Sequence, residues 1–252
     1  MNQANSLLNK TILITRPLGR EAHLRQIIEQ AGGKVIHYPV ISINPPTDLE
    51  IEQLMQLRER LQSFTMAIFI SPTAVDQSQT YFPVLPEHLT IASIGKKTTQ
   101  ALARHHINVD LEAPGYNSES LLRIDAFQMP KVQGQRILIF RGNGGRAYLG
   151  DTLIKRKAQV RYVETYHREI PSHPPLSLEQ IKTLDAVTVS SSEGLENLIA
   201  LMEDPGLLVD IPLIVPSPRS VTLARQHGFR KIIAADNATD EATLSALTNS
   251  LK

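Results

Sequence analysis

Short apolar runs alternate with longer amphipathic stretches along the whole chain. This is the rhythm of α/β units, in which a buried strand is followed by a helix. The first unit combines a strand at 10–15 with a helix at 21–30 that is ended by Gly32-Gly33. Further strands are predicted at 35–39, 66–70, 91–94, 136–140, 160–163, 186–189, 213–215 and 232–234. So many strands suit two modest parallel sheets better than one very wide sheet.

Three segments of the first half recur in the same order in the second half. Segment 11–20 aligns with 136–146 if one residue is inserted, 69–75 aligns with 189–195, and 94–104 aligns with 216–226. Repetition in a fixed order is typical of a duplicated structural unit. The sequence therefore predicts two similar α/β lobes.

The turns that follow the strands carry Arg, Ser, Thr, Gly and Lys in both halves. Because parallel sheets bind ligands at the carboxyl ends of their strands, we expect a polar cleft between the lobes. Ser71-Pro72 is typical of an N-cap followed by proline, and Ser190-x-x-Glu193 fits a capping box. Such helix starts present free N–H groups that bind carboxylate or phosphate, although capping alone also explains the serines.

Composition narrows the function classes. The 252 residues include 26 basic and 25 acidic side chains, so the net charge of +1 excludes a strongly basic nucleic-acid binder. The absence of cysteine excludes disulfides and thiolate catalysis, and the histidine spacings predict no metal site. The apolar runs are too short to span a bilayer, and residues 1–5 lack signal-peptide features. We therefore expect a cytoplasmic protein without nucleic-acid or membrane partners.

One motif supports a different interpretation. Gly142-x-Gly144-x-x-Ala147 follows a strand and opens a helix, and Glu164 lies near the end of the next strand, as in dinucleotide-binding sites. The corresponding turn, 16–20, lacks these glycines but keeps both arginines. A nucleotide- or NAD-binding α/β enzyme therefore remains an alternative, as does a two-lobed anion-binding module without catalysis.

Two tyrosines, Tyr38 and Tyr166, follow predicted strands where the chain would leave a lobe. A phenol at such a place can pack a hinge or face the cleft. Because a phenol is protonated at neutral pH, it can also act as a general acid. From the residues alone, both a structural and a chemical role stay open.

Taken together, the ordered motifs resemble the uroporphyrinogen-III synthase family over nearly the whole chain, from Ile12 to Leu247. The resemblance lies in the order and spacing of short motifs, namely 15–17, 69–75, 94–98, 141–146, 163–166 and 189–194. It implies two α/β lobes joined by a two-stranded β ladder, with a cleft between them. Lobe one would be 1–37 plus 169–252, lobe two 44–162, and the connecting strands 38–43 and 163–168.

The resemblance also implies a reaction. Linear hydroxymethylbilane would lose water and close to uroporphyrinogen III, with inversion of the terminal pyrrole ring, in tetrapyrrole and heme biosynthesis. The enzyme would be a hydro-lyase that needs neither a cofactor nor a metal. Its partner would be the small-molecule substrate, and we expect a monomer.

Residue roles follow from the same resemblance. Tyr166, on the second connecting strand, would give a proton to the leaving hydroxyl group. The hydroxyls of the family's cleft correspond to Ser71, Thr98, Ser191 and Ser220, which would bind the substrate's side chains. Arg16 and Arg141 occupy paired turns and would bind carboxylates or pair with a neighbouring acid. This chain departs from the family at Ser217 and at Glu193, which adds a negative charge near a site for a polyanion.

Overall fold

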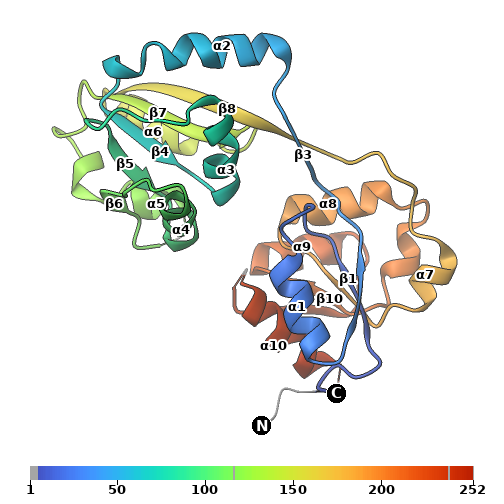
Figure 1. Cartoon of the computed structure of the whole chain (residues 1–252). Coiled ribbons are helices and arrows are strands. Elements are labelled where there is room, and N and C mark those ends of the chain that lie inside the picture. The colour runs from blue at the N-terminus through green and yellow to red at the C-terminus, as the bar shows by residue number, and fades with distance from the viewer. Residues whose placement is uncertain (1–4, 116, 238, 252) are drawn as a thin grey trace. The chain divides into compact units, whose positions relative to one another are not determined.

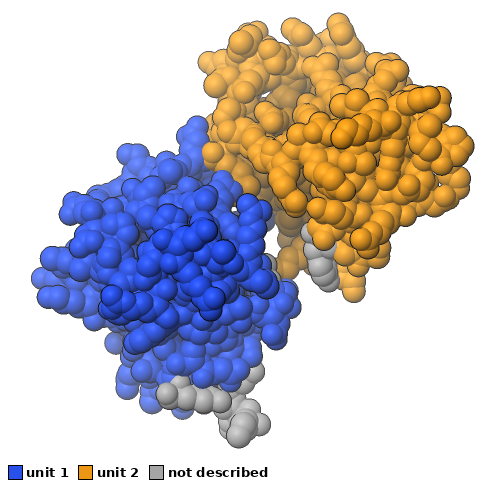
Figure 2. Space-filling model, turned by 180° about the vertical axis from the view of Figure 1, so that it is seen from behind, with its two compact units in different colours: residues 1–43, 169–252 blue, residues 44–168 orange. Residues whose placement is uncertain are grey.

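The structure is a computed structural model that describes residues 5–115, 117–237 and 239–251 (Figure 1). The chain divides into two compact units (Figure 2). Unit 1 comprises residues 1–43 and 169–252, and unit 2 comprises residues 44–168. Residues 38–43 thus belong to unit 1 and residues 163–168 to unit 2, whereas residues 1–4 of the expected first lobe lie outside the described residues.

Unit 1 is built on a parallel sheet with the strand order β11-β10-β9-β1-β2. Its strands are β1 (Thr11–Ile14), β2 (Lys34–His37), β9 (Ala186–Thr188), β10 (Leu213–Val215) and β11 (Ile232–Ala234). Its helices are α1 (Ala22–Gln30), α7 (Leu178–Lys182), α8 (Ser192–Leu201), α9 (Pro218–Gln226), α10 (Asp240–Ser250) and the 3₁₀ turn η3 (Pro205–Leu208). Alternate residues of β1 point to opposite faces, so Leu13 joins one core cluster while Ile12 and Ile14 join the other.

Unit 2 contains a sheet with the order β3-β8-β7-β4-β5-β6. The strands of this sheet are β3 (Ser42–Asn44), of which only Asn44 belongs to unit 2, β4 (Met66–Phe69), β5 (Thr90–Ser93), β6 (Leu111–Glu112), β7 (Arg136–Gly142) and β8 (Gln159–Glu169), whose last residue belongs to unit 1. Its helices are α2 (Asp48–Arg58), α3 (Pro72–Tyr81), α4 (Lys96–Arg104), α5 (Ser118–Leu121), α6 (Tyr148–Lys155) and the 3₁₀ turns η1 (Leu61–Ser63) and η2 (Asp125–Phe127).

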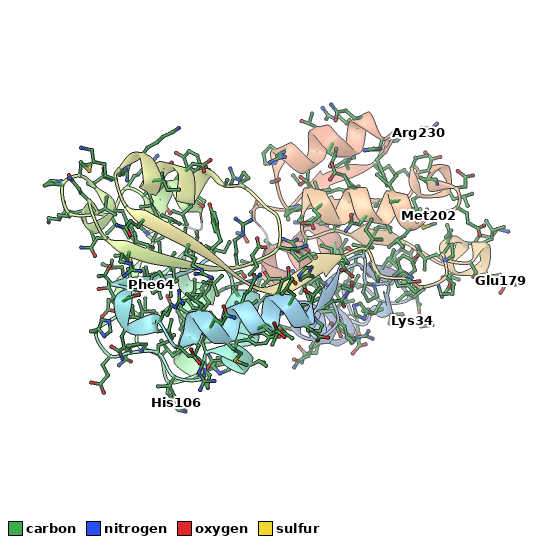
Figure 3. The ribbon with its side chains drawn as sticks, turned by 90° about the horizontal axis from the view of Figure 1, so that it is seen from above. Lys34, Phe64, His106, Glu179, Met202 and Arg230 are labelled. Carbon is green, nitrogen blue, oxygen red and sulfur yellow. The ribbon has the colours of Figure 1, made fainter. Side chains whose placement is uncertain are left out.

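Aromatic contacts hold the strands of unit 2 to the elements around them. Phe69 of β4 stacks on Phe140 of β7 with 4.5 Å between ring centroids, and Phe82 meets Phe140 edge-on at 5.2 Å. At the opposite end of β7, the Arg136 guanidinium lies 5.1 Å from the ring centroid of Phe64, which is labelled in Figure 3. Ring stacking therefore joins β4 to β7 at their carboxyl ends, and Arg136 ties the start of β7 to the segment before β4.

The two sheets repeat one topology. Strands β6-β5-β4-β7-β8 of unit 2 follow the same order as β11-β10-β9-β1-β2 of unit 1, and a helix follows the corresponding strand in each unit. The aligned segments of the sequence repeat fall on corresponding strands, with β1 matching β7 and β9 matching β4. The prediction of two similar parallel α/β lobes is confirmed.

Three strands differ from the sequence prediction. The connecting strand expected at 38–43 is replaced by the shorter β3, which covers Ser42–Asn44. Strand β8 runs unbroken from Gln159 to Glu169, so the predicted strand at 160–163 and the connecting strand at 163–168 are one element. Strand β6 was not predicted, because Leu111 and Glu112 form no apolar run. Its two residues are ordered by pairing with Ala92 and Ser93 of β5.

Helix α2 begins with a capping box that is tied to β8. The Glu50 carboxylate accepts hydrogen bonds from the Thr47 amide, the Thr47 hydroxyl and His167 Nε2, each at 2.8 Å. These contacts, led by the Thr47 backbone N–H, hold the pKa of Glu50 below its ordinary value of 4.5. The ionised carboxylate therefore favours the folded state.

We expect the stabilising contribution of Glu50 to be complete above pH 4.5 and to disappear as the pH falls through the lowered pKa of the folded protein. Glu50→Gln should therefore unfold more easily than wild type at neutral pH, and the gap should close in acid. Denaturant unfolding across this pH range measures the gap. Glu52→Gln, an exposed change on the same helix, is the matched control, and a Glu50→Gln gap that does not vary with pH would contradict the expectation.

Candidate active site

Two side chains, Ser71 and Tyr166, meet at the carboxyl edge of the unit 2 sheet. Ser71 follows β4 as the N-cap of α3, where its Oγ accepts from the Ala74 N–H at 3.0 Å and Pro72 is the first helical residue, as predicted. Tyr166 lies opposite Gly142, the last residue of β7. The Tyr166 hydroxyl is 3.4 Å from Ser71 Oγ. The sheet thus brings together two residues that are far apart in the sequence.

The Tyr166 ring lies directly on the backbone of Gly142. A Cβ at residue 142 would stand 2.5 Å from Cε2 and 2.6 Å from Cζ of the ring, which is closer than real contacts allow. Tyr166 itself is 5% exposed. Only glycine at position 142 therefore lets the phenol lie flat at this edge.

Arg141 precedes that glycine and is 6% exposed. Its Nε donates to the Gly142 carbonyl at 3.0 Å, and its guanidinium lies 4.8 Å from the Tyr162 ring centroid. The Glu164 carboxylate is 3.9 Å from the same Nε and is partly exposed. Arg141 is therefore a buried cation held by a carbonyl and an aromatic face, with a carboxylate at the outer limit of ion pairing.

The glycines of the dinucleotide-like motif have roles in this turn that need no nucleotide. A Cβ at Gly145 would stand 2.6 Å from Arg141 Nη2, so this glycine makes room for the guanidinium. Gly144 and Gly145 have φ of +65° and +79°, a backbone region that favours glycine. Side-chain packing and turn geometry thus account for the pattern at 142–145.

A hollow of about 280 Å³ opens beside these residues. Its lining includes three arginines, and no carboxylate is among the described residues that line it: Ile70, Ser71, Ile94, Asn117, Ser118, Arg141, Gly142, Asn143, Gly144, Gly145, Arg146, Tyr166 and Arg168. The hollow is slightly smaller than the roughly 300–1,000 Å³ typical of small-molecule sites. It suits an anion, or one negatively charged part of a larger ligand.

Sequence reasoning missed Asn143 and Arg168 among these residues. Arg168 lies two residues after Tyr166 on the same strand, so the period of two along a strand was a usable signal. Asn143 could not be recognised from the sequence. Its side-chain oxygen accepts a hydrogen bond from the Arg168 N–H, and only the folded sheet brings these two groups together.

Thr98 is placed away from the hollow. It lies in the first turn of α4, is 2% exposed, and its N–H bonds to the Gly95 carbonyl at 2.9 Å. It belongs to the same unit as Ser71 and Tyr166, but it does not line the hollow that they share.

The predicted serines of unit 1 also lie at helix starts. Ser191 caps α8 by accepting from the Gly194 N–H at 2.9 Å. Ser220, which is 1% exposed, has its Oγ 3.1 Å from Ser217 Oγ and 3.2 Å from Ser192 Oγ. The capping box predicted for Ser190 with Glu193 is wrong. Because α8 begins at Ser192, Glu193 is the second helical residue and does not occupy the third position that the box requires.

Arg16 has a partner within unit 1. Its guanidinium forms an ion pair with Asp240, at the start of α10, and the other carboxylate oxygen of Asp240 is 2.7 Å from His23 Nδ1. Of the two roles predicted for Arg16, pairing with a neighbouring acid is the one present in the structure. Tyr38 is likewise packed, since its hydroxyl donates to the Pro174 carbonyl at 3.3 Å and its ring meets His173 edge-on.

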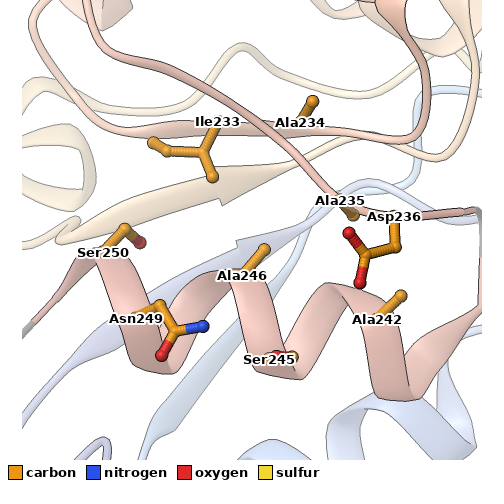
Figure 4. Close-up of a pocket in the computed structure, with 9 residues that line it drawn as sticks. All are labelled: Ile233, Ala234, Ala235, Asp236, Ala242, Ser245, Ala246, Asn249 and Ser250. Carbon is orange, nitrogen blue, oxygen red and sulfur yellow. The ribbon is translucent and has the colours of Figure 1, made fainter.

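Other features of the described residues offer less chemistry. A hollow of about 330 Å³ lies beside β11 and α10 in unit 1, and its lining is small, apolar or uncharged apart from Asp236 (Figure 4). No group of three or more His, Asp or Glu side chains within the described ranges is arranged to hold a metal ion. In that same part of the chain, no helix has both the length and the apolar character needed to cross a membrane.

A family model, two related proteins and two solved structures that match this chain carry the same name. The family model described as "Uroporphyrinogen-III synthase HemD" matches residues 22–245. The uroporphyrinogen-III synthase of Escherichia coli K12 is 32% identical over 94% of this chain and 99% of its own length, and that of Salmonella typhimurium is 31% identical with the same coverage. Uroporphyrinogen-III synthase structures from Thermus thermophilus and Helicobacter pylori match with TM-scores of 0.63 and 0.61. The two matches cover 96% of this chain and 98% and 100% of the solved chains. Their sequence identities are only 15% and 14%, so they support the fold alone.

Proposed function

The chain belongs to the uroporphyrinogen-III synthase family, whose members are enzymes that cyclise hydroxymethylbilane in tetrapyrrole biosynthesis, and we propose that its chemistry is centred on Tyr166. The observation that carries this proposal is the 3.4 Å contact between the Tyr166 hydroxyl and Ser71 Oγ at the edge of an arginine-lined hollow. A proton donor and an anion-binding surface are the two features that this reaction requires.

Tyr166 is proposed as the proton donor to the hydroxyl group that leaves as water. Because Ser71 Oγ accepts from the Ala74 N–H, its own proton is available to bond to the Tyr166 oxygen. The phenol proton is then directed to the ligand. After transfer, the phenolate would lie beside the cation that forms on the terminal ring, and the Ser71 hydroxyl would stabilise its charge. Loss of water and ring closure involve no net oxidation or reduction, so we propose that no cofactor or metal takes part.

Arg141 is proposed to bind a carboxylate of the substrate at this hollow. The substrate is a polyanion, and a buried guanidinium whose ion pair with Glu164 is long, at 3.9 Å, favours an anionic ligand. The size of the hollow suits one ring with its side chains better than the whole bilane. Holding that ring still is the main requirement, because the bilane also cyclises unaided to the unrearranged type I isomer.

The remaining predicted residues are proposed to contribute less directly. Ser191 and Ser220 lie at the starts of α8 and α9, where helix N–H groups favour carboxylates. Thr98 is buried, so a contact with substrate would require the first turn of α4 to move. Arg16 is already paired with Asp240, and we expect it to add less to substrate binding than Arg141.

An isomer assay tests the function. Purified protein is incubated with fresh hydroxymethylbilane, the products are oxidised, and type I and type III uroporphyrins are separated. We expect type III to dominate and to increase with protein concentration. Type I alone, formed at the protein-free rate by protein shown to be folded, would contradict the proposal. Thermal shift with NAD(H) or NADP(H), expected to be absent, tests the dinucleotide alternative.

We further propose that the protein acts in the cytoplasm as a monomer, without a nucleic-acid or membrane partner. Its net charge of +1 supports the absence of nucleic-acid and membrane partners, because binding to nucleic acid or to an anionic membrane surface requires an excess of basic residues. Sedimentation at micromolar concentration would reveal a dimer if one forms.

A further inference from the structure

Strand β8 carries an irregularity immediately before Tyr166. In the β7–β8 pairing, Arg141 lies opposite Glu164, but the next residue, Gly142, lies opposite Tyr166. Thr165 is therefore an extra residue in β8, as in a β-bulge. A bulge changes the direction of the side chains that follow it, and here it places the phenol over Gly142.

Asn143 holds β8 just beyond this bulge. Its backbone N–H donates to the Tyr166 carbonyl at 3.0 Å, and its side-chain Oδ1 accepts from the Arg168 N–H at 2.8 Å. In a regular parallel ladder, the N–H and the carbonyl of one residue bond to the two residues that flank its partner. The Asn143 side chain takes the place of its own carbonyl, so the pairing continues while the backbone turns away toward Gly144. We name these two hydrogen bonds the Asn143 clamp.

The bulge destabilises the fold, so stability does not explain its presence. Thr165 is fully buried, and its Oγ1 has no hydrogen-bond partner among the residues that the structure describes. A buried hydroxyl without a partner destabilises a folded protein, because it has given up its hydrogen bonds to water and formed none in their place. A regular strand would avoid the extra residue, so its retention calls for a role in placing a neighbouring group.

Unit 1 provides an internal comparison. Its strand β2 pairs with β1 from Thr11↔Lys34 to Ile14↔His37, and two further backbone bonds follow, from the Tyr38 N–H to the Ile14 carbonyl at 2.9 Å and from the Val40 N–H to the Thr15 carbonyl at 3.2 Å. In the aligned turn 16–20, Leu18 stands where unit 2 has Asn143, and its side chain has no oxygen to form the second bond of a clamp. The repeated fold therefore closes at this place without the side-chain bond of the clamp. That bond lies beside the strand that carries Tyr166.

We propose that Asn143 is a positioning residue for Tyr166. Its clamp fixes the β8 backbone on either side of His167, so that the phenol remains over Gly142 and within reach of Ser71. This inference rests on the proposed role of Tyr166. Asn143 acts through the tyrosine, and the proposal assigns it no contact with substrate.

Two variants separate the hydrogen bond from the size of the side chain. Asn143→Leu keeps a similar volume but removes the acceptor, whereas Asn143→Asp keeps an oxygen that can accept from the Arg168 N–H. Asn143 is only partly buried, so we expect both variants to fold. Hydrogen exchange at the Arg168 amide should be slow in wild type and in Asn143→Asp and faster in Asn143→Leu. Unchanged exchange would show that the clamp does not form.

Kinetics of type III formation then test the role. Displacing a reacting group by about 1 Å costs on the order of 10²-fold in rate, so we expect Asn143→Leu to lower kcat about that much with little change in KM. Asn143→Asp should recover most of kcat, with a raised KM because its carboxylate adds a negative charge to the hollow that Asn143 lines. In a Tyr166→Phe background, Asn143→Leu should have no further effect. Equal losses in both backgrounds, or an unchanged kcat, would overturn the proposal.

The outcomes distinguish this inference from the function on which it rests. If wild type forms no type III isomer above the protein-free rate, the proposed function fails and the inference fails with it. If wild type is active but Tyr166→Phe keeps full rate, the function stands while the inference is overturned, because Asn143 would have no phenol to position.

Discussion

Tyr166→Phe is expected to lower kcat for type III formation about 10²–10⁴-fold, the range over which general acids contribute to enzymatic rates. The change removes only the hydroxyl. The ring continues to pack on Gly142, so the fold and the shape of the hollow should persist. Because the phenol is proposed to act on the leaving group and not in initial binding, KM should change little. Single-turnover formation of type III product, measured on freshly prepared substrate, gives the rate directly.

Tyr38→Phe is the matched control for this prediction. Tyr38 is as buried as Tyr166, at 6% against 5% exposure, and its hydroxyl meets backbone groups, donating to the Pro174 carbonyl and forming a hydrogen-bond contact with the Leu176 backbone. It should keep nearly the wild-type kcat, even if its stability falls. A Tyr166→Phe variant with full activity would remove the phenol from the mechanism.

Arg16→Met is expected to destabilise the protein more than it impairs substrate binding. Asp240 is 9% exposed in its side chain, and Arg16 is one of its partners. Removing one charge of a buried pair typically costs about 3–5 kcal/mol, because the other charge stays buried with fewer partners. The contact with His23 persists, so we expect a loss near the lower end of that range. Denaturant unfolding measures the change in the free energy of unfolding.

Two further variants test whether the loss of stability comes from the buried ion pair. Arg16→Met combined with Asp240→Leu should recover most of the stability, since neither charge is then buried. Arg25→Met removes an exposed pair with Glu29, and such surface pairs contribute only about 0.3–0.5 kcal/mol. A stable Arg16→Met protein with a raised KM would instead make Arg16 a substrate ligand.

The apolar pattern of the sequence predicts most strands of the two sheets. Strands 213–215 and 232–234 are predicted with the bounds that the structure has, because each is a short apolar run followed by a turn. The order of the repeated segments predicted two lobes of one topology. Strand β6 escaped prediction, since its two residues are defined by a neighbouring strand and not by their own character.

The candidate site was less accessible to sequence reasoning. Ser71 could be recognised as an N-cap from Ser71-Pro72, since that signal is local. The partner of Arg16 could not, because Asp240 lies 224 residues later in the chain. The packing of Gly142 against Tyr166 depends on a bulge in β8, and no local pattern reveals in which strand an extra residue will be accommodated.

The discontinuity of unit 1 determines the order in which the chain can fold during synthesis. Strand β1 lies between β2 and β9, and the segments that meet at the β1–β9 pairing are separated by 174 residues. When residue 168 leaves the ribosome, unit 2 is complete, whereas β1 and β2 are a two-stranded fragment with an open edge. Such a pair is marginally stable at best and exposes apolar surface to chaperones or to aggregation. Unit 2, which carries Tyr166, can thus fold first. Strand β1 joins its sheet only after β9 has been synthesised.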